Sequence, residues 1–590
     1  MNQTAIIEQP AIAPLRVGPT EGYNRAAPSY LALVLLVVIL ALFTTALAIF
    51  YVPAHQGPDQ NAYDVAARML VEHHRLYFKL SNPWQFMGDN QVLLPNGRVY
   101  PKYPPGTSLL AATSWLLGGH SSAMYLMDPL CAVLACAMSF FLFRFLLDDF
   151  AALLGVIWLA CNPLVLFFAN YGDSHGAALL FTVLGFWALL AWRNYGGFWR
   201  ALLAGGILGF CCWIRYTELL WFLPMLAVAL RPWHRPRRRF LEGLSAIAAF
   251  ALPVAILAGL NWVVFGAPWR TAYALCGEQT GFAWRYFIGN AAAHPPRPGD
   301  WRILMDQSAD LGLYLLLPFT LLGLVRLFWI HWRMGLMLTL WIIPSGMLYL
   351  LYYWAPDNLG YARFFMDLLP ALILAGLWLA SRAVASQRAA TAIGLGLLTL
   401  LGTGFNLYHI APQLLSRVAA KLNLVEARDA LRASLPRGSV ILADGSMDNY
   451  LASVGGYRLY NEQMFYPRFF QKMRRLARHR GPQIIEPLSA RHYLTLLARR
   501  GPHGKIHAPS WAQLRQDESQ IIARAWRNHK AVAILGWQRG ITRFLPEPLS
   551  GQARIKVLAR WQPPTLHVGR WQSQWALVQL LPKQTNQTAK

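Results

Sequence analysis

Residues Tyr30–Val52 read YLALVLLVVILALFTTALAIFYV, an apolar run that contains no charged side chain. An α-helix needs about 20 apolar residues to cross the hydrocarbon core of a bilayer, so this run is long enough to span a membrane. It is too long for the apolar region of a signal peptide, and no evident cleavage site follows it. The run therefore predicts a membrane span that the protein retains.

Further apolar runs follow at short intervals along the chain. Of its 590 residues, 56% are hydrophobic and 14% are charged, which is typical of a protein that crosses the membrane many times. About eleven spans are expected near residues 30–52, 122–146, 150–169, 174–192, 201–214, 217–230, 241–264, 309–329, 334–354, 364–381 and 389–410. Two of these runs are short, and we interpret them as a hairpin of half-length helices around Arg215.

The basic residues between the spans indicate an orientation, because Lys and Arg are enriched in cytoplasmic loops. With a cytoplasmic N-terminus, one side of the membrane receives Arg16, Arg25, Arg144, Arg326, Arg333, Arg382 and Arg388. The outer side then receives the long loops 53–121 and 265–308 and, because the number of spans is odd, the C-terminal part. We expect a multi-pass protein of the cell inner (plasma) membrane whose functional site and C-terminal domain are extracytoplasmic.

Three regions are expected along the chain. Residues 1–29 are polar and suit a cytoplasmic tail, and residues 30–411 contain the spans and the outer loops. Polar and apolar residues mix from 412 to 590, with a helical pattern over 424–435, a turn at 436–438 and a strand-like run over 439–443. The last region is predicted to be a small α/β domain. An interfacial helix is expected to end at Gly118 in the first outer loop.

The formal net charge of +26 raises the question of a nucleic-acid partner. The Arg residues lie in short loops and in the last third of the chain, and no nucleic-acid-binding motif accompanies them, so no such partner is expected. Cytoplasmic loop bias, membrane lipids and phosphorylated substrates explain the charge better. Five of the six Cys lie inside apolar runs, which indicates neither a disulfide framework nor a thiolate metal site.

Two carboxylates are expected at the outer face. Asp59 lies in GPDQNAY (57–63) after the first span, and Asp173 lies in NYGDSH (170–175) between later spans. Carboxylates at the mouths of membrane helices are costly to keep near lipid and are more often functional than not. Both also suit the alternative role of capping the helix that follows. Lys102, Arg215 and Arg363 share this face, where snorkelling toward headgroups is their alternative role.

Three motifs around the first four spans resemble the GT-C glycosyltransferases of the protein O-mannosyltransferase and aminoarabinose-transferase type, which are bacterial family 39-like. They are DQNAYDVA (59–66), YPKYPPGTSLL (100–110) and GDS (172–174). The resemblance covers residues 30–410 in layout, with its motifs between about 60 and 240. It implies an all-α polytopic membrane fold, here joined to the small C-terminal α/β extracytoplasmic domain. It also implies a hexosyl- or pentosyltransferase that moves a sugar from a polyprenyl-phosphate donor to an envelope lipid, glycan or protein acceptor.

The resemblance also suggests roles for individual residues. The acidic residue of the first outer loop, Asp59, corresponds to the cavity carboxylate of the family, and a carboxylate there is suited to take the proton of an acceptor hydroxyl. The cations that suit the donor phosphate are Lys102, Arg215 and Arg363. The other residues expected to line the substrate cavity are Tyr63, Tyr103, Asp173 and His175.

Two questions stay open at the level of sequence. A transporter or lipid flippase for a phosphorylated or glycosylated substrate is the alternative function, although it predicts charges midway along spans and inverted repeats. A non-catalytic scaffold would leave the outer carboxylates unexplained. The outer His residues His55, His73, His74 and His175 do not define a metal site by their spacing, so no metal ligand is assigned, no cofactor is certain and a divalent cation stays open.

Overall fold

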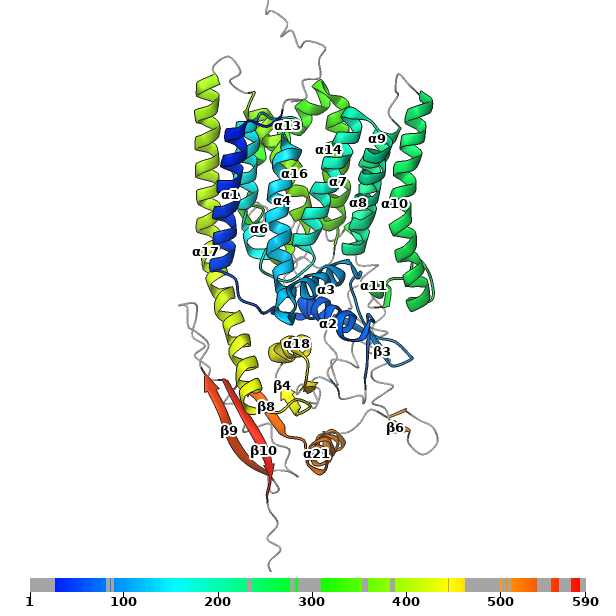
Figure 1. Cartoon of the computed structure of the whole chain (residues 1–590), viewed down its shortest axis with the longest axis vertical. Coiled ribbons are helices and arrows are strands. Elements are labelled where there is room, and N and C mark those ends of the chain that lie inside the picture. The colour runs from blue at the N-terminus through cyan, green and yellow to red at the C-terminus, as the bar shows by residue number, and fades with distance from the viewer. Residues whose placement is uncertain are drawn as a thin grey trace, which may run out of the picture.

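The structure, a computed structural model, describes residues 27–80, 85, 90–230, 236–275, 282–284, 309–352, 359–382, 388–443, 445–461, 499–500, 506–507, 511–537, 553–561 and 575–583. The polar tail, most of the second outer loop and the Arg residues near position 475 lie outside the described residues. The described part is a bundle of long helices with a smaller mixed region at one end (Figure 1). We call this end of the bundle the α2 end, because α2 (Pro58–His73) lies there.

Seven described helical segments are long and apolar enough to cross a membrane: Tyr30–Ile49 (α1), Ser121–Phe143 (η1 and α4), His175–Tyr195 (α7), Phe240–Phe265 (within α10, Pro236–Phe265), Trp332–Leu350 (α14), Leu359–Ala380 (α15, η5 and α16) and Ala389–Ser434 (within α17, Arg388–Ser434). Four shorter apolar segments accompany them: Asp149–Ala160 (α5), Phe198–Ile214 (α8), Tyr216–Ala229 (η2 and α9) and Leu317–Ile330 (α13). Each predicted span has its counterpart here, and the fold class is confirmed.

The predicted span 150–169 is divided into two helices. α5 ends at Ala160, and α6 (Pro163–Phe168) begins at a proline, which has no N–H to donate and stands at the first helical position. The side chain of Asn162 accepts a hydrogen bond from the backbone N–H of Leu164 at 3.0 Å and caps the second helix. This break directs the chain toward the loop that carries Asp173.

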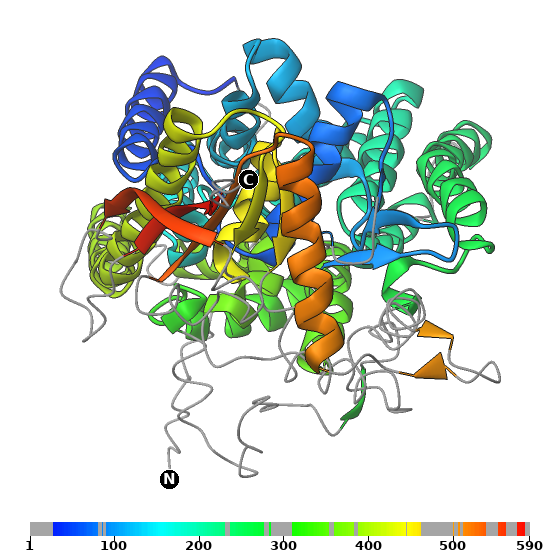
Figure 2. The same ribbon diagram turned by 90° about the horizontal axis from the view of Figure 1, so that it is seen from below.

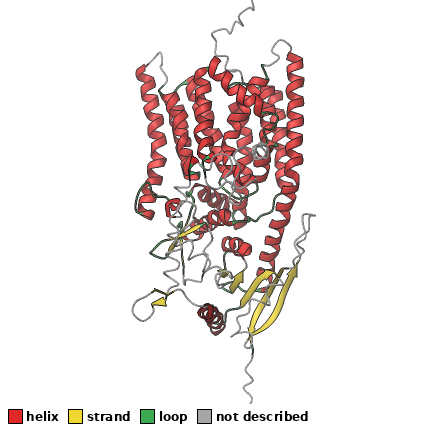
Figure 3. Ribbon diagram, turned by 180° about the vertical axis from the view of Figure 1, so that it is seen from behind, coloured by secondary structure: helices red, strands yellow, loops and turns green. Residues whose placement is uncertain are grey.

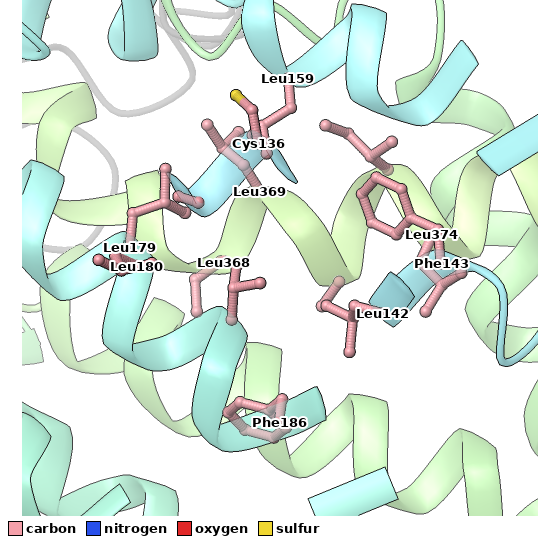
Figure 4. Packing of buried hydrophobic residues seen from close by; sticks show 14 of the residues in the cluster. Cys136, Leu142, Phe143, Leu159, Leu179, Leu180, Phe186, Leu368, Leu369 and Leu374 are labelled. Carbon is pink, nitrogen blue, oxygen red and sulfur yellow. The ribbon is translucent and has the colours of Figure 1, made fainter. Parts of the chain in front are cut away.

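Close packing holds the bundle together. Buried leucines, phenylalanines and Cys136 interdigitate between neighbouring helices (Figure 4). The rings of Phe186 and Trp341 stack with centroids 3.5 Å apart. Gly205 of α8 lies so close to α10 that a Cβ there would be 2.1 Å from the carbonyl oxygen of Ala246. Small residues allow such close approach between membrane helices, where packing replaces the hydrophobic effect as the main attraction.

The helix α17 joins the bundle to the C-terminal region. It has 47 residues, or about 70 Å at 1.5 Å per residue, and it extends from the bundle past the α2 end (Figure 1). The predicted last span and the helical pattern over 424–435 are parts of this one helix, which continues through Pro412. The domain boundary expected between residues 411 and 412 falls inside this helix and stays a prediction.

The C-terminal region contains a five-stranded sheet, whose strands are drawn in Figures 2 and 3. Hydrogen bonds join the strands in the order β5-β4-β8-β10-β9. Its strands are β4 (Val440–Ala443), β5 (Arg458–Asn461), β8 (Val532–Trp537), β9 (Ala553–Trp561) and β10 (Trp575–Pro582). β4 is parallel to β5 and β8, and β10 is antiparallel to β8 and β9. The other elements are α18 (Gly445–Val454), α21 (Trp511–Arg527), β6 (Arg499–Arg500) and β7 (Ile506–His507).

The first outer loop folds against the end of the bundle. It contains α2, α3 (Gly106–Gly118) and a three-stranded sheet of β1 (Phe78–Lys79), β2 (Gln91–Leu93) and β3 (Arg98–Pro101) in the order β1-β3-β2. α3 ends as predicted, because Gly119 adopts φ of 70° at its C-cap. The short α11 (Ala272–Leu275) follows α10.

Candidate active site

Asp59 stands in the first turn of α2. The N-cap of this helix is Gly57, whose φ of 116° suits a residue without a Cβ, and Pro58 occupies the first helical position. The capping role considered for Asp59 therefore belongs to another residue, and the carboxylate is directed elsewhere. It is partly buried, with 22% of its side chain exposed.

The Asp59 carboxylate belongs to a row of four polar side chains, each in contact with the next. Arg363 Nη2 donates to Asp59 Oδ2 at 2.9 Å, and Asn90 Nδ2 donates to Asp59 Oδ1. Lys102 Nζ donates to Asn90 Oδ1 at 2.7 Å. The predicted residues Asp59, Lys102 and Arg363 thus meet at one place, with Asn90 as a fourth member that the sequence did not single out.

The hairpin of β2 and β3 explains why Asn90 lies beside Lys102. Gln91 is paired with Pro101 in the antiparallel ladder, and the N–H of Lys102 donates to the carbonyl oxygen of Asn90 at 3.0 Å. The two residues therefore stand opposite each other where the strands end. Their side chains leave the hairpin together toward α2.

The charges around Asp59 favour its ionised form. Burial acts to raise the pKa of this carboxyl, but the positive charges of Arg363 and Lys102 outweigh burial and hold the pKa of Asp59 below its ordinary value. A carboxylate of this kind is ionised at neutral pH and can accept a proton. It is also a weaker base than one without cationic neighbours.

Asp173 is held in a tight loop between α6 and α7. Gly172 has φ of 92°, and Asp173 Oδ1 accepts a hydrogen bond from the N–H of His175, the first residue of α7, at 2.9 Å. The N-cap of α7 is Ser174, so this contact is a turn just before the helix and not the cap that the alternative predicted. Asp173 Oδ2 lies 3.7 Å from Arg363 Nη1, so the same carboxylate also faces the candidate site.

The environment of Asp173 differs from that of Asp59. Burial, with 2% of the residue exposed, raises the pKa of Asp173 to about 6, although the nearby Arg363 partly opposes the shift. The two carboxylates share one guanidinium, which is planar and presents donors in a fixed fork. Arg363 therefore bridges α2 and the loop before α7.

Arg215 lies in a second, buried ion-pair network. Its Nη1 donates to Asp367 Oδ2 at 2.6 Å, its Nε lies 3.8 Å from Glu218, and its Nη2 donates to the Tyr349 hydroxyl. These contacts place its guanidinium against acidic side chains of the bundle. Its predicted contact with a donor phosphate stays a prediction.

His175 connects Arg215 to the loop of Asp173. Its Nδ1 lies 3.2 Å from Arg215 Nη1, and its Nε2 lies 3.7 Å from Asp173 Oδ2. Because a guanidinium can only donate, Nδ1 must be the acceptor, and the proton of the neutral imidazole is on Nε2. His175 is therefore oriented with its N–H toward the Asp173 carboxylate.

Aromatic side chains line the side of Lys102. The rings of Tyr63 and Tyr103 stack with centroids 4.7 Å apart, and Tyr273 meets Tyr103 edge-on at 5.8 Å. The Nζ of Lys102 lies 5.2 Å from the Tyr103 ring and 5.5 Å from the Tyr273 ring. The two tyrosines predicted to line the cavity are thus next to Asp59 and Lys102 and form an aromatic wall. Such a wall suits a sugar or an apolar chain.

The structure adds two residues that the sequence did not single out. Asp367 follows Arg363 by one helical turn inside an apolar run, and an acidic residue there is a signal of function or pairing in its own right. Asn90 lies in a loop with many polar residues, and no pattern distinguishes it. Among the described residues, no group of three His, Cys, Asp or Glu side chains is arranged to hold a metal ion.

The fold and the site define a polytopic membrane protein with charged groups gathered at the α2 end. No family model matches the sequence, and no curated protein matches it. Among solved structures, apo ArnT from Cupriavidus metallidurans aligns with a TM-score of 0.52 and 12% identity over 93% of this chain and 98% of that chain. This likeness shows the fold: the chain has the GT-C fold, and the predicted resemblance to the aminoarabinose-transferase type is confirmed at that level.

Two further solved structures align less closely. ArnT from the same organism bound to undecaprenyl phosphate gives a TM-score of 0.47 at 13% identity over 93% of this chain and 98% of that chain. The archaeal oligosaccharyltransferase AglB from Archaeoglobus fulgidus, in complex with an inhibitory peptide and a dolichol-phosphate, gives 0.44 at 11% identity over 73% of this chain and 65% of that chain.

Proposed function

We propose that this protein is an integral-membrane glycosyltransferase that moves a hexosyl or pentosyl group from a polyprenyl-phosphate donor to an envelope lipid, glycan or protein. The reaction takes place at the outer face of the inner membrane. The observation that carries the proposal is the Asp59 carboxylate, which lies between Arg363 and the Asn90–Lys102 pair. A base and two cations meet there at the end of a membrane bundle. The GT-C fold shared with ArnT supports this class of reaction.

Asp59 acts as the general base in this proposal. The acceptor oxygen attacks the anomeric carbon of the donor, its proton passes to the Asp59 carboxylate, and the bond from the anomeric carbon to the phosphate oxygen breaks. The leaving polyprenyl phosphate takes the electron pair of that bond. A positioned base contributes roughly 100- to 10,000-fold to such a reaction.

Arg363 and Lys102 stabilise the leaving phosphate. Negative charge grows on its oxygens as the bond breaks, and each preorganised donor in a water-poor site contributes about 3 kcal/mol to such stabilisation. Both cations are already ordered, Arg363 by two carboxylates and Lys102 by Asn90 and two aromatic rings. Less reorganisation is then needed when the charge develops.

Donor binding should also strengthen the base. A phosphate that draws the Arg363 guanidinium toward itself competes with Asp59 for that guanidinium. The pKa of Asp59 would then rise toward its ordinary value, and its carboxylate would become a better proton acceptor. The ion pair between Asp59 and Arg363 thus keeps the base weak until the donor arrives.

Mass spectrometry of polyprenyl-phosphate lipids and envelope glycans tests the proposal. Cells carrying the wild-type chain are compared with cells carrying Asp59→Asn at matched protein levels. The expected result is accumulation of one polyprenyl phosphosugar together with loss of one glycan modification, and the mass of that lipid names the sugar. Identical lipid and glycan profiles in the two strains would contradict the proposal.

A further inference from the structure

Four other segments of the chain each contribute a group that contacts the loop carrying Asp173. The N–H of Gly172 donates to Asp128 Oδ2 of α4 at 2.6 Å, and Asn170 Nδ2 donates to the carbonyl oxygen of Leu47 in α1 at 3.0 Å. A Cβ at Gly172 would lie 2.2 Å from the imidazole ring of His55, so ring and backbone are in direct contact. The fourth group comes from α17.

That group is Lys421, a buried lysine with 2% of its surface exposed. Its Nζ donates to the carbonyl oxygen of Asn170, three residues before Asp173 and 251 positions away in the chain. The side chains of Asp128 and Asp64 lie near enough to favour a charge on this amine, and Arg417 of the same helix opposes it. A buried lysine amine is costly and is retained where its hydrogen bonds are specific.

The same network reaches the helix of the catalytic carboxylate. Asp64 belongs to α2, one turn and a half after Asp59, and its Oδ2 lies 2.9 Å from Nδ1 of His55. His55 in turn packs against Gly172. Lys421, His55 and Asp64 therefore connect the loop of Asp173 to the helix of Asp59.

α17 also carries this connection into the C-terminal region. Leu424 and Leu431 of α17 share one buried apolar core with Ile441 of β4 and Ala67 of α2. Trp561 Nε1 of β9 donates to Asn423 Oδ1 at 2.6 Å, two residues after Lys421. A further contact is the β-bridge of Gln85 in the first outer loop with Tyr460 in β5.

We propose that Lys421 is a positioning residue. It fixes the position of Asp173, and through Asp173 that of Arg363, relative to α17 and the C-terminal domain. This inference rests on the proposed function, because the geometry it sets is that of the transfer site. A misplacement of about 1 Å in an active site costs roughly 100-fold in rate. The C-terminal domain thus acts on catalysis by fixing α17, and Lys421 transmits that position to the loop.

The test compares Lys421→Met with Lys421→Arg in the full chain, purified and held in lipid nanodiscs. Glu426→Gln is the control, because Glu426 lies on the same helix and its side chain is exposed. Hydrogen–deuterium exchange of the peptide that covers residues 170–175 is measured first and needs no substrate. kcat and KM are then measured with the polyprenyl-phosphate sugar that the mass-spectrometry experiment identifies.

Lys421→Met is expected to raise exchange at residues 170–175 and to lower kcat about 10- to 100-fold, with KM within about threefold of wild type. Lys421→Arg keeps an N–H donor and should recover most of both losses, and Glu426→Gln should change neither. Unchanged exchange and kcat in Lys421→Met would overturn the proposal. If that variant does not fold, Lys421→Gln provides the comparison. A wild-type chain without transfer activity would contradict the proposed function, while the exchange data would still decide whether Lys421 holds the loop.

Discussion

Arg363 donates a hydrogen bond to Asp59 at 2.9 Å across 304 positions of the chain. The guanidinium begins the η5 segment (Arg363–Leu368) that leads into α16 (Leu369–Ala380), and the carboxylate begins α2 in the first outer loop. Its second carboxylate neighbour, Asp173, lies 3.7 Å away. One cation therefore joins three segments that are distant in sequence.

Substitution of Asp59 by Asn is expected to lower transfer by roughly 100- to 10,000-fold, because the amide keeps the shape of the side chain but cannot accept the proton. Glu72→Gln is the matched control, since Glu72 lies on the same helix and is exposed at its other end. Turnover is measured on purified protein, with abundance and thermal unfolding measured in parallel. Full activity in Asp59→Asn would remove Asp59 from the reaction.

Replacement of Arg363 by Lys should lower kcat/KM at least tenfold and raise the KM for the donor. A single ammonium lacks the planar fork that contacts Asp59 and Asp173 together and that matches a phosphate bidentately. Arg382→Lys is the control, because Arg382 lies just beyond the other end of the same span and contacts the carbonyl oxygen of Trp378. Equal effects of the two substitutions would mean that the charge of Arg363 acts only on the bilayer or on folding.

The pH dependence of transfer should follow Asp173. Its pKa is raised to about 6 by burial, so its carboxylate and the contact with Arg363 are lost as the pH falls through 6. kcat/KM is therefore expected to decline below pH 6 in the wild type. In Asp173→Asn the remaining activity should decline only at lower pH, where Asp59 with its lowered pKa takes up a proton. An unchanged acid limb in that variant would assign the limb to another group.

Asp173 also has an expected effect on stability, with a sign opposite to that of an ordinary ion-paired carboxylate. Its pKa in the folded state lies above the ordinary value near 3.8, so the folded state binds more protons than the unfolded state between about pH 4 and 6. The contribution of Asp173 to the free energy of unfolding therefore falls as the pH rises through that window and is constant above it. Thermal unfolding of wild type and Asp173→Asn from pH 4 to 7 measures the difference.

The sequence predicted the bundle because its signal is repeated and local. Each span is a run of apolar residues, and the predicted span 150–169 is divided at Pro163, which stands at the start of α6. The length of α17 was not predicted, because its apolar half and its amphipathic half have different patterns. A change from an apolar to an amphipathic pattern along one helix cannot be distinguished in the sequence from a boundary between two domains.

The site was predicted in part. Asp59, Lys102 and Arg363 were expected at one face from topology alone, and the structure brings them together. Arg215 was expected at the same face, but its acidic partner Asp367 comes from a segment 152 positions away. Topology places residues at the same end of a bundle, whereas the pairing among them depends on how the helices pack, which no local pattern records.

The pairing of Arg215 with Asp367 leads to a prediction that separates a structural role from phosphate binding. Arg215 is buried with Asp367 and Glu218, and removal of one partner from such a network leaves carboxylates without their counter-charge. Breaking a buried pair in this way costs about 3–5 kcal/mol. Arg215→Met is therefore expected to lower the thermal unfolding midpoint of the protein in nanodiscs. The double variant Arg215→Met with Asp367→Asn should recover part of this loss, because it leaves fewer uncompensated charges than the single variant. A contact with the donor phosphate would instead raise the KM for the donor at an unchanged midpoint, and the second substitution would then bring no recovery.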